Sequence, residues 1–285
     1  PNEPIKIPQS TGWIWNSPST AKRSINFGLL SRAIFYVLAI LGANAATPLN
    51  ANSEESGSVW ITLGTGGGPT PQVNRARISN LLISGDDMIL FDAGDGVVQR
   101  LAATRTTVDK IDAIVLSHLH SDHTAGLPAF LSLRLQLTFR QPIIVYGPPG
   151  TSELVSGIVA SLQPAERADV ATLGPMVPAS ESVQAQELEC LGETTLVART
   201  AVKSIRNSHF TLSDGTEVDG VVSCSFRIET GDRSIVYTGD TGPSPGVEEL
   251  AEGADLLVSE VIDVPATLLI IGGSGSGKTT VAEAV

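Results

Sequence analysis

The sequence has few basic residues. Its 285 residues include 18 Lys and Arg against 30 Asp and Glu, which gives a formal net charge of −12 and a pI of about 4.7. Proteins that hold a phosphate backbone generally do so with a basic surface. The composition therefore argues against a nucleic-acid partner. It does not exclude a small anionic ester substrate.

Cysteine is also scarce, because Cys190 and Cys224 are the only two in the chain. Their spacing does not match a zinc-finger pattern. An oxidising compartment would permit a bridge between them. A bridge requires a Cα separation below about 7 Å, which the sequence does not fix, so two separate buried thiols are the alternative.

Long apolar runs are missing. Residues 1–20 have no clear period and remain an unassigned leader that begins with Pro1, which indicates a fragment or a processed form. Residues 21–46 combine a basic segment, a short apolar run (Ala33–Leu41) and a small-x-small pattern (Ala43–Ala45), as in a secretory signal peptide. The apolar run is too short for a stable membrane span. We expect export to the periplasm or medium, with an interfacial helix as the alternative, and a linker over residues 47–57.

The few histidines are concentrated in one place. Three of the four lie between positions 118 and 123, after an apolar, β-branched run (Ile111–Leu116) that predicts a buried strand. A helix is predicted from Leu127 to Leu137. On an extended segment, His118 and His120 face the same way and can share one ion, while Asp122 and His123 face a second. A histidine-rich solvated loop is the alternative.

This His-x-His-x-Asp-His motif resembles that of the metallo-β-lactamase superfamily. The segments Leu63–Pro69 and Leu90–Gly96 resemble opening motifs of its ribonuclease Z and arylsulfatase-like branch, and Gly239–Thr241 resembles a later aspartate motif. The resemblance covers residues 58–264. It implies an α+β fold, an αββα sandwich of two mixed sheets with helices outside, whereas periodicity alone gives only α/β or α+β.

The resemblance also implies a site with two zinc ions. His118, His120 and His209 correspond to ligands of the first metal, Asp122 and His123 to ligands of the second, and Asp240 to a bridging carboxylate. A metal-bridging hydroxide would attack a phosphodiester, sulfate ester or related ester. Asp122 and Glu260 are candidate catalytic residues. Asp122 would orient the nucleophile, and Glu260 would either assist proton transfer or support the metal ligands. Asp92 either supports the metal loop or satisfies a turn.

The family pattern is incomplete at the second metal. It requires a further histidine late in the chain, and none follows His209. Residues 265–285 predict instead a strand, a Gly-x4-Gly-Lys-Thr loop and the start of a helix, a Walker A pattern that resembles uridine kinase-like enzymes. Gly272, Gly277, Lys278 and Thr279 would cradle phosphates and Mg²⁺. We interpret this tail as the beginning of another domain, with the last part of the hydrolase domain missing.

The leading interpretation is an exported zinc-dependent hydrolase. A ribonuclease Z-type endonuclease that cleaves RNA 3′ ends is the near alternative, disfavoured by the acidic charge and by a segment, Tyr146 to Ala198, whose only basic residue is Arg167. A P-loop nucleotide-binding protein or an inactive metal-binding remnant would each account for part of the sequence.

The residue pattern makes four local predictions. A helix is predicted from Thr151 to about Leu162, followed by an irregular stretch from Gln163 to Ser182. One continuous strand is predicted from Thr194 to Val202. Arg134 is expected on the exposed face of its helix.

Overall fold

The computed structural model describes residues 57–137, 141–231, 233–259, 269–272 and 280–283. The leader, the signal segment (21–46), Glu260 and most of the Walker loop, including Gly277, Lys278 and Thr279, lie outside the described residues. Within the described part, no helix is both long and apolar enough to cross a membrane.

The first sheet contains the strands that lead into the histidine cluster. Its order is β13-β1-β2-β3-β4-β5-β6. Strand β2 is antiparallel to both of its neighbours, β1 and β3, whereas β3 to β6 run parallel, and β13 is parallel to β1. The strands are β1 (Val59–Gly64), β2 (Ser79–Ser84), β3 (Asp87–Ala93), β4 (Ala113–Val115), β5 (Ile143–Gly147), β6 (Val183–Glu187) and β13 (Thr280–Glu283).

The second sheet is antiparallel except for one pair. Its order is β12-β11-β10-β9-β8-β7, and only β10 and β11 are parallel. The strands are β7 (Leu191–Val197), β8 (Thr200–Arg206), β9 (Cys224–Glu229), β10 (Ser234–Tyr237), β11 (Leu256–Ser259) and β12 (Leu269–Gly272).

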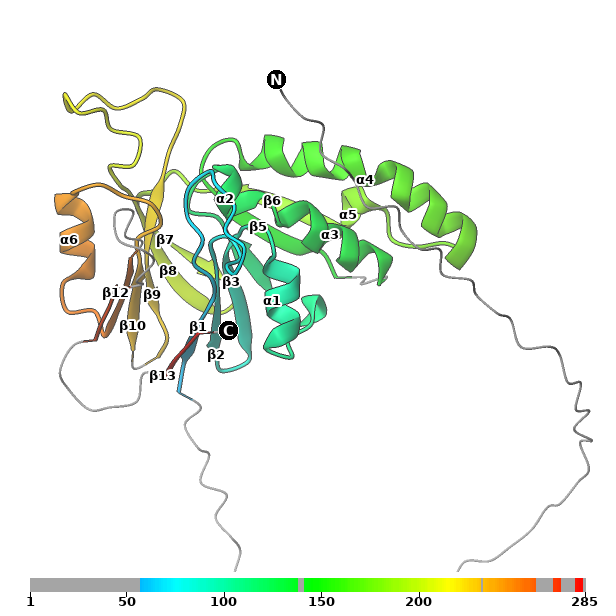
Figure 1. The fold of residues 1–285 in the computed structure, drawn as a ribbon, viewed down its shortest axis with the longest axis horizontal. Coiled ribbons are helices and arrows are strands. Elements are labelled where there is room, and N and C mark those ends of the chain that lie inside the picture. Colours follow the sequence, from blue (N-terminus) through cyan, green and yellow to red (C-terminus); the bar gives the residue numbers. More distant parts are fainter. Residues whose placement is uncertain (1–56, 138–140, 232, 260–268, 273–279, 284–285) are drawn as a thin grey trace, which may run out of the picture. The chain divides into compact units, whose positions relative to one another are not determined.

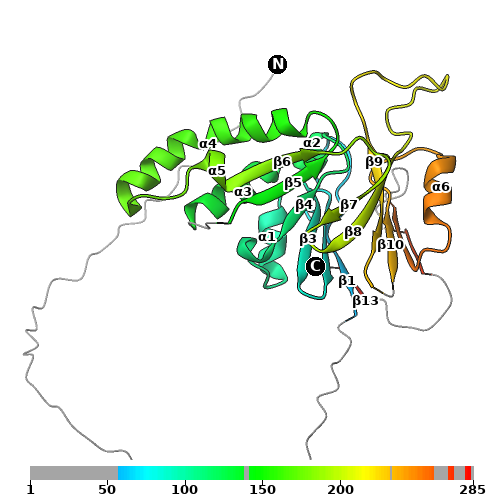
Figure 2. The same cartoon turned by 180° about the vertical axis from the view of Figure 1, so that it is seen from behind.

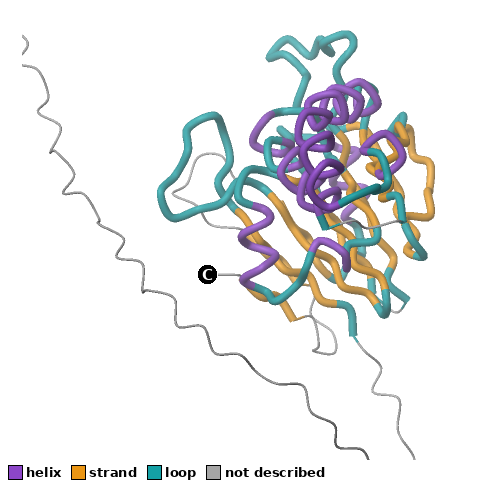
Figure 3. The backbone as a smooth tube through the Cα atoms, turned by 90° about the vertical axis from the view of Figure 1, so that its right-hand side faces the viewer, coloured by secondary structure: helices purple, strands orange, loops and turns teal. Residues whose placement is uncertain are grey.

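The helices lie on the outer sides of the two sheets, with α1, α3 and α4 beside the first sheet and α6 beside the second (Figures 1 and 2). The same layers are seen from the side in Figure 3. The helices are α1 (Val97–Ala103), α2 (Ser121–Thr124), α3 (Leu127–Gln136), α4 (Thr151–Leu173), α5 (Ala179–Ser182) and α6 (Pro245–Ala251), with a 3-10 turn η1 (Val108–Lys110). The αββα arrangement predicted from the family resemblance is confirmed.

Two cores follow from the alternation of side chains along the strands. Leu81 and Leu90 point into the cluster beneath the helices, and their neighbours Leu82 and Phe91 point into the cluster between the sheets. Both faces of the first sheet are therefore apolar, as expected for strands covered on two sides. The inter-sheet core centres on four aromatic rings with centroids 5.2–6.1 Å apart, those of Trp60, Phe91, Phe226 and Tyr237.

The predicted end of the helix that begins at Thr151 and the predicted single strand from Thr194 to Val202 are both wrong. Helix α4 continues past Leu162 to Leu173, although Pro164 lies inside it. The proline removes one N–H, but the Ala, Glu and Arg residues that follow are good helix formers. The predicted strand Thr194–Val202 is a hairpin, with Ala198 at φ 54° in the turn. No Gly, Pro or Asn marks that turn in the sequence.

Tertiary contacts overturn two further expectations. Arg134 is buried, because its guanidinium donates to the carbonyl oxygens of Val108 (2.8 Å) and Gln141 (2.9 Å). Residues 280–283 form strand β13 beside β1, where the Walker interpretation predicts the start of a helix. Gly272 ends β12, which pairs with β11 as an antiparallel edge strand.

Candidate metal centre

The histidine cluster lies where neighbouring parallel strands end. Strand β3 ends in Asp92 and Ala93, and β4 leads into Ser117 and His118. Because the carboxyl ends of parallel strands meet at one edge of a sheet, these side chains converge. His120 follows in extended conformation, and the short helix α2 then presents Asp122 and His123.

The first group of ligand atoms comprises ring nitrogens of His118, His120 and His209. Nδ1 of His120 lies 3.1 Å from Nε2 of His118 and 3.1 Å from Nε2 of His209. One proton cannot lie along both contacts, whereas a single cation accepts three lone pairs at once. Ligand nitrogens around a tetrahedral zinc are separated by roughly 3.3 Å, given Zn–N bonds of about 2.05 Å. The observed spacing therefore fits a metal.

The second group comprises His118, His123 and Asp240, whose ligand atoms lie within 4.8 Å of one another. Nε2 of His123 is 3.1 Å from Oδ1 of Asp240, and Oδ2 of Asp240 is 3.9 Å from Nε2 of His118. His118 is common to both groups, and Asp240 belongs to the second. The carboxylate of Asp122 is 3.8 Å from Nε2 of His123, at the margin of this group.

Asp92 is fully buried behind the histidines and accepts four hydrogen bonds. The donors are Nδ1 of His123 (2.8 Å), the amide of Ser117 (2.7 Å), its hydroxyl (2.8 Å) and the hydroxyl of Tyr237 (2.5 Å). Its backbone has φ 59°, a conformation that Asp tolerates better than most residues. The carboxylate therefore supports the cluster, as one of the two sequence interpretations expected.

These hydrogen bonds fix which ring nitrogens face the candidate metals. A carboxylate only accepts, so Nδ1 of His123 carries a proton and Nε2, which lies 3.1 Å from Oδ1 of Asp240, is the ligand position. The Ser117 hydroxyl gives its one proton to Asp92, so at 3.1 Å it accepts from Nδ1 of His118. Nε2 of His118 is then the ligand nitrogen.

The histidines differ in their protonation. Burial, assisted by the nearby His123 ring, lowers the pKa of His118 to about 3. Burial also disfavours the charged form of His123, but Asp92 and Asp240 outweigh it and raise the pKa of that ring well above its ordinary value. Burial lowers the pKa of His209. His118 is therefore a ready ligand at neutral pH, whereas His123 must lose a proton to become one.

A glycine-rich loop, Gly64–Pro69, holds Asp122. The amide of Gly68 donates to Oδ2 of Asp122 at 2.7 Å. The loop is itself held by the buried guanidinium of Arg77, which donates to the carbonyl oxygens of Gly66 (3.1 Å), Gly67 (3.2 Å), Gly68 (2.5 Å) and Pro69 (2.9 Å). Arg77 therefore fixes the loop that orients the carboxylate.

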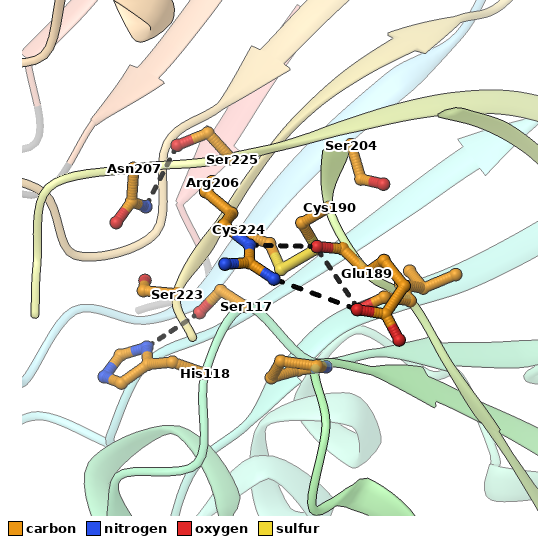
Figure 4. Close-up of a disulfide and its surroundings, with 12 residues drawn as sticks. Ser117, His118, Glu189, Cys190, Ser204, Arg206, Asn207, Ser223, Cys224 and Ser225 are labelled. Carbon is orange, nitrogen blue, oxygen red and sulfur yellow. Dashed lines mark hydrogen bonds and ion pairs between the residues drawn. A yellow bond between two sulfur atoms is a disulfide. The ribbon is translucent and has the colours of Figure 1, made fainter. Parts of the chain in front are cut away.

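Cys190 and Cys224 form a disulfide, with Cα atoms 5.9 Å apart. This settles the pairing that the sequence left open. The amide of Cys224 donates to the carbonyl oxygen of Ser117 at 2.9 Å, so the bridge lies beside the metal loop (Figure 4). It joins the residue that precedes β7 to the first residue of β9.

The sequence interpretation missed Ser117, Tyr237 and Arg77. Ser117 adjoins the motif, but its role appears only with Asp92, 25 residues away. Tyr237 lies 145 residues from Asp92, and nothing in its local sequence indicates that contact. All six proposed ligands, by contrast, are close together: His118, His120, Asp122, His123, His209 and Asp240.

Comparison with known proteins agrees with this geometry. The family described as the beta-lactamase superfamily domain matches residues 87–285. A ribonuclease Z of Mycolicibacterium paratuberculosis is 34% identical over 221 residues, covering 74% of this chain and 73% of that protein. The chain belongs to the metallo-β-lactamase superfamily. With its histidine and aspartate clusters, it is a hydrolase of the metal-dependent kind.

Several members of the superfamily are similar in sequence or structure. A ribonuclease Z of Mycolicibacterium gilvum is 35% identical, covering 72% of this chain and 69% of that protein. The crystal structure of human tRNase Z, short form, superimposes with a TM-score of 0.51 at 25% identity, covering 70% and 76% of the two chains. YhfI of Bacillus subtilis, described as a metallo-β-lactamase fold protein, shares the fold with a TM-score of 0.54 at 21% identity, covering 71% of each chain.

These relatives overturn one expectation. The acidic composition argued against a nucleic-acid partner, yet the related superfamily members are named as ribonucleases. The inference from net charge was wrong because it averaged over the whole chain. The binding of a phosphodiester depends on the electric field at the site itself, and bound metal ions are the largest charges in such a site.

Proposed function

We propose that the chain is a zinc-dependent endoribonuclease of the ribonuclease Z type, which cleaves a phosphodiester near the 3′ end of an RNA precursor. The observation that carries this proposal is the 34% identity to a ribonuclease Z over 73% of that protein's length. The clustered histidines and Asp240 supply the metal ligands that such a reaction needs. A sulfate ester, one of the substrate classes expected from the sequence, has no comparable support.

Each proposed ligand has a distinct position. His118, His120 and His209 would hold one zinc ion, and His123 and Asp240 would hold a second beside Asp122. When bound, such a pair supplies a nucleophile at neutral pH and stabilises charge on the phosphate. His120 is exposed and His209 half-buried, whereas His118 and His123 are fully buried. Substrate would therefore approach over His120 and His209.

The chain's own groups would prepare this chemistry. Asp92 keeps a proton on Nδ1 of His123 and turns Nε2 toward the metal side. Asp122, held by the Gly68 amide, is placed to accept a proton from the attacking water. The contribution of Glu260 and of the Walker residues Gly272, Gly277, Lys278 and Thr279 stays a prediction, as does the imperfect ligand set expected at the second metal.

The test is cleavage of a precursor tRNA with a 3′ extension by the purified zinc-loaded chain. We expect cleavage at the base of the extension, and loss of both zinc and turnover in His120→Ala. Ser121→Ala is the matched control, because that side chain is exposed on the same loop and is outside both ligand groups. Zinc is counted by elemental analysis in each variant.

Three outcomes would contradict the proposal. Full activity in His120→Ala would remove the metal assignment. If the precursor stays intact and an aryl sulfate is hydrolysed rapidly, the substrate is a sulfate ester and not RNA. ATP-dependent protection of the fold, in the absence of RNA cleavage, would favour the P-loop interpretation.

We also propose that the enzyme works outside the reducing cytosol. The disulfide supports this, because such bridges persist mainly in oxidising compartments. Together with the predicted signal segment it favours export. Thiol alkylation of freshly lysed cells, followed by mass spectrometry, tests the proposal: alkylated Cys190 and Cys224 in the native protein would contradict it.

A further inference from the structure

A cavity of about 680 Å³ opens beside the exposed edge of the metal cluster. Its lining includes His120 and Leu119 from the metal loop, Phe210 and Val221 from the β8–β9 connection, and Gly157 from α4. Helix α4 and this connection lie toward the same end of the sheets (Figures 1 and 2). The volume is in the range of about 300–1,000 Å³ that small-ligand sites occupy.

The aromatic ring of Phe210 connects the cavity to the metal centre. Its centroid is 5.2 Å from that of His120 and 4.6 Å from that of His209. A group that contacts Phe210 in the cavity therefore lies within one residue's length of the proposed ligands. This distance suits the nucleotide that adjoins the cleaved phosphate.

The charge of the lining selects what can enter. Of the described lining residues only His120 and Glu153 are ionisable, and none is Lys or Arg. A second phosphate would meet the Glu153 carboxylate and no cation. An uncharged planar ring would instead meet Phe210 and aliphatic side chains, which is how proteins bind unstacked bases of single-stranded RNA.

We propose that this cavity binds the base of the nucleotide next to the cleaved phosphodiester, stacked against Phe210. The inference rests on the proposed ribonuclease function and deepens it. The base must then be unpaired to enter the cavity, so the enzyme would select an unpaired nucleotide at the cleaved bond.

Gly157 offers a way to fill the cavity without touching a metal ligand. A Cβ added there would meet no heavy atom within 4 Å, so Gly157→Phe places its ring in open space. Ser156→Phe is the matched control, because Ser156 is the preceding residue of α4, is exposed and does not line the cavity. Phe210→Leu is the second test variant, since it keeps apolar volume and removes the planar ring.

The first experiment measures binding of adenosine to the zinc-loaded enzyme by saturation-transfer NMR. We expect saturable binding in the unmodified enzyme and in Ser156→Phe, and binding weakened at least about tenfold in Gly157→Phe and Phe210→Leu. Ribose 5-phosphate, which lacks a base, should not bind at the same concentration. Zinc content should be equal in all four proteins. Absence of adenosine binding, or equal binding in Gly157→Phe, would overturn the proposal.

The second experiment uses precursor RNAs with one abasic ribose on either side of the cleaved bond. One of the two should be cleaved roughly tenfold more slowly by the unmodified enzyme, and Gly157→Phe should abolish that difference. Equal cleavage of the abasic and complete precursors would overturn the cavity proposal while the ribonuclease stands. Adenosine binding without cleavage of any precursor would overturn the proposed ribonuclease function, while the cavity would still be a site that binds a base.

Discussion

The carboxylate of Asp92 accepts a hydrogen bond from Nδ1 of His123 across 2.8 Å, with both side chains fully buried. A carboxylate behind a metal-binding histidine fixes its orientation and tautomer. The Tyr237 hydroxyl, which extends from the aromatic core between the sheets, holds the same carboxylate. The position of His123 is therefore set by the inter-sheet core.

Asp92→Asn should weaken metal binding at His123. The amide keeps the size of the side chain but accepts more weakly and can donate, so the tautomer of His123 is no longer fixed. We expect affinity for the second metal to fall about 10–100-fold, measured by competition with a chromogenic chelator. Asp95→Asn, three residues on and exposed, is the control. Equal affinity in both variants would show that Asp92 only completes a turn.

Binding of the second metal should release a proton near pH 7. The pKa of His123 is raised above its ordinary value of 6.5, so this ring is charged in the metal-free protein, whereas His118, with a pKa of about 3, is neutral. Metal affinity at His123 should thus increase as pH rises from 6.5 toward the raised pKa. In the metal-free protein, the stabilisation that charged His123 provides is present below pH 6.5 and is lost as pH rises through the raised pKa.

Titration calorimetry in buffers of different ionisation enthalpy measures this proton. About one proton should leave with the second metal and none from His118 with the first. Asp92→Asn should reduce the release, because its carboxylate charge is the largest influence that raises the pKa of His123. Identical proton release in the parent and the variant would contradict this account.

Arg77→Ala should destabilise the glycine loop and, through it, Asp122. The guanidinium donates to four carbonyl oxygens, of which that of Gly66 is buried, and a buried acceptor that loses its donor carries a desolvation cost. We expect the free energy of unfolding to fall by about 2–3 kcal/mol in urea titrations, with weaker binding of the second metal. Lys110→Ala removes an exposed cation and is the control. A loss of stability without any change in metal binding would separate Arg77 from the site.

Reduction of the disulfide should lower stability and loosen the metal loop. The bridge closes a segment of 34 residues, and chain entropy predicts a contribution of about 3–4 kcal/mol. The measurement is urea unfolding with and without a phosphine reductant, which does not supply thiols to the metal. The double variant Cys190→Ser/Cys224→Ser is the control. It should be as unstable as the reduced protein and insensitive to reductant; any response to reductant in that variant would point to another target.

The sequence by itself determined the metal loop. Three histidines and an aspartate lie within six positions, after a β-branched run and before a helix, so the spacing alone identifies the segment that carries most of the ligands. Continuous apolar, β-branched runs also determined most strands, because a strand covered on both sides has a recognisable composition. The family motifs then indicated the αββα fold.

Tertiary structure decided what local patterns do not encode. Tyr237 donates a hydrogen bond to Asp92, 145 residues away in the sequence. Arg134 is buried where its guanidinium donates to carbonyl oxygens of two other segments. The net charge of the chain did not predict the class of partner, because recognition depends on where the charges lie in the folded protein. Periodicity records which face of an element is buried; only packing determines which residue lies opposite, and at this site those opposing residues set the protonation of the ligands.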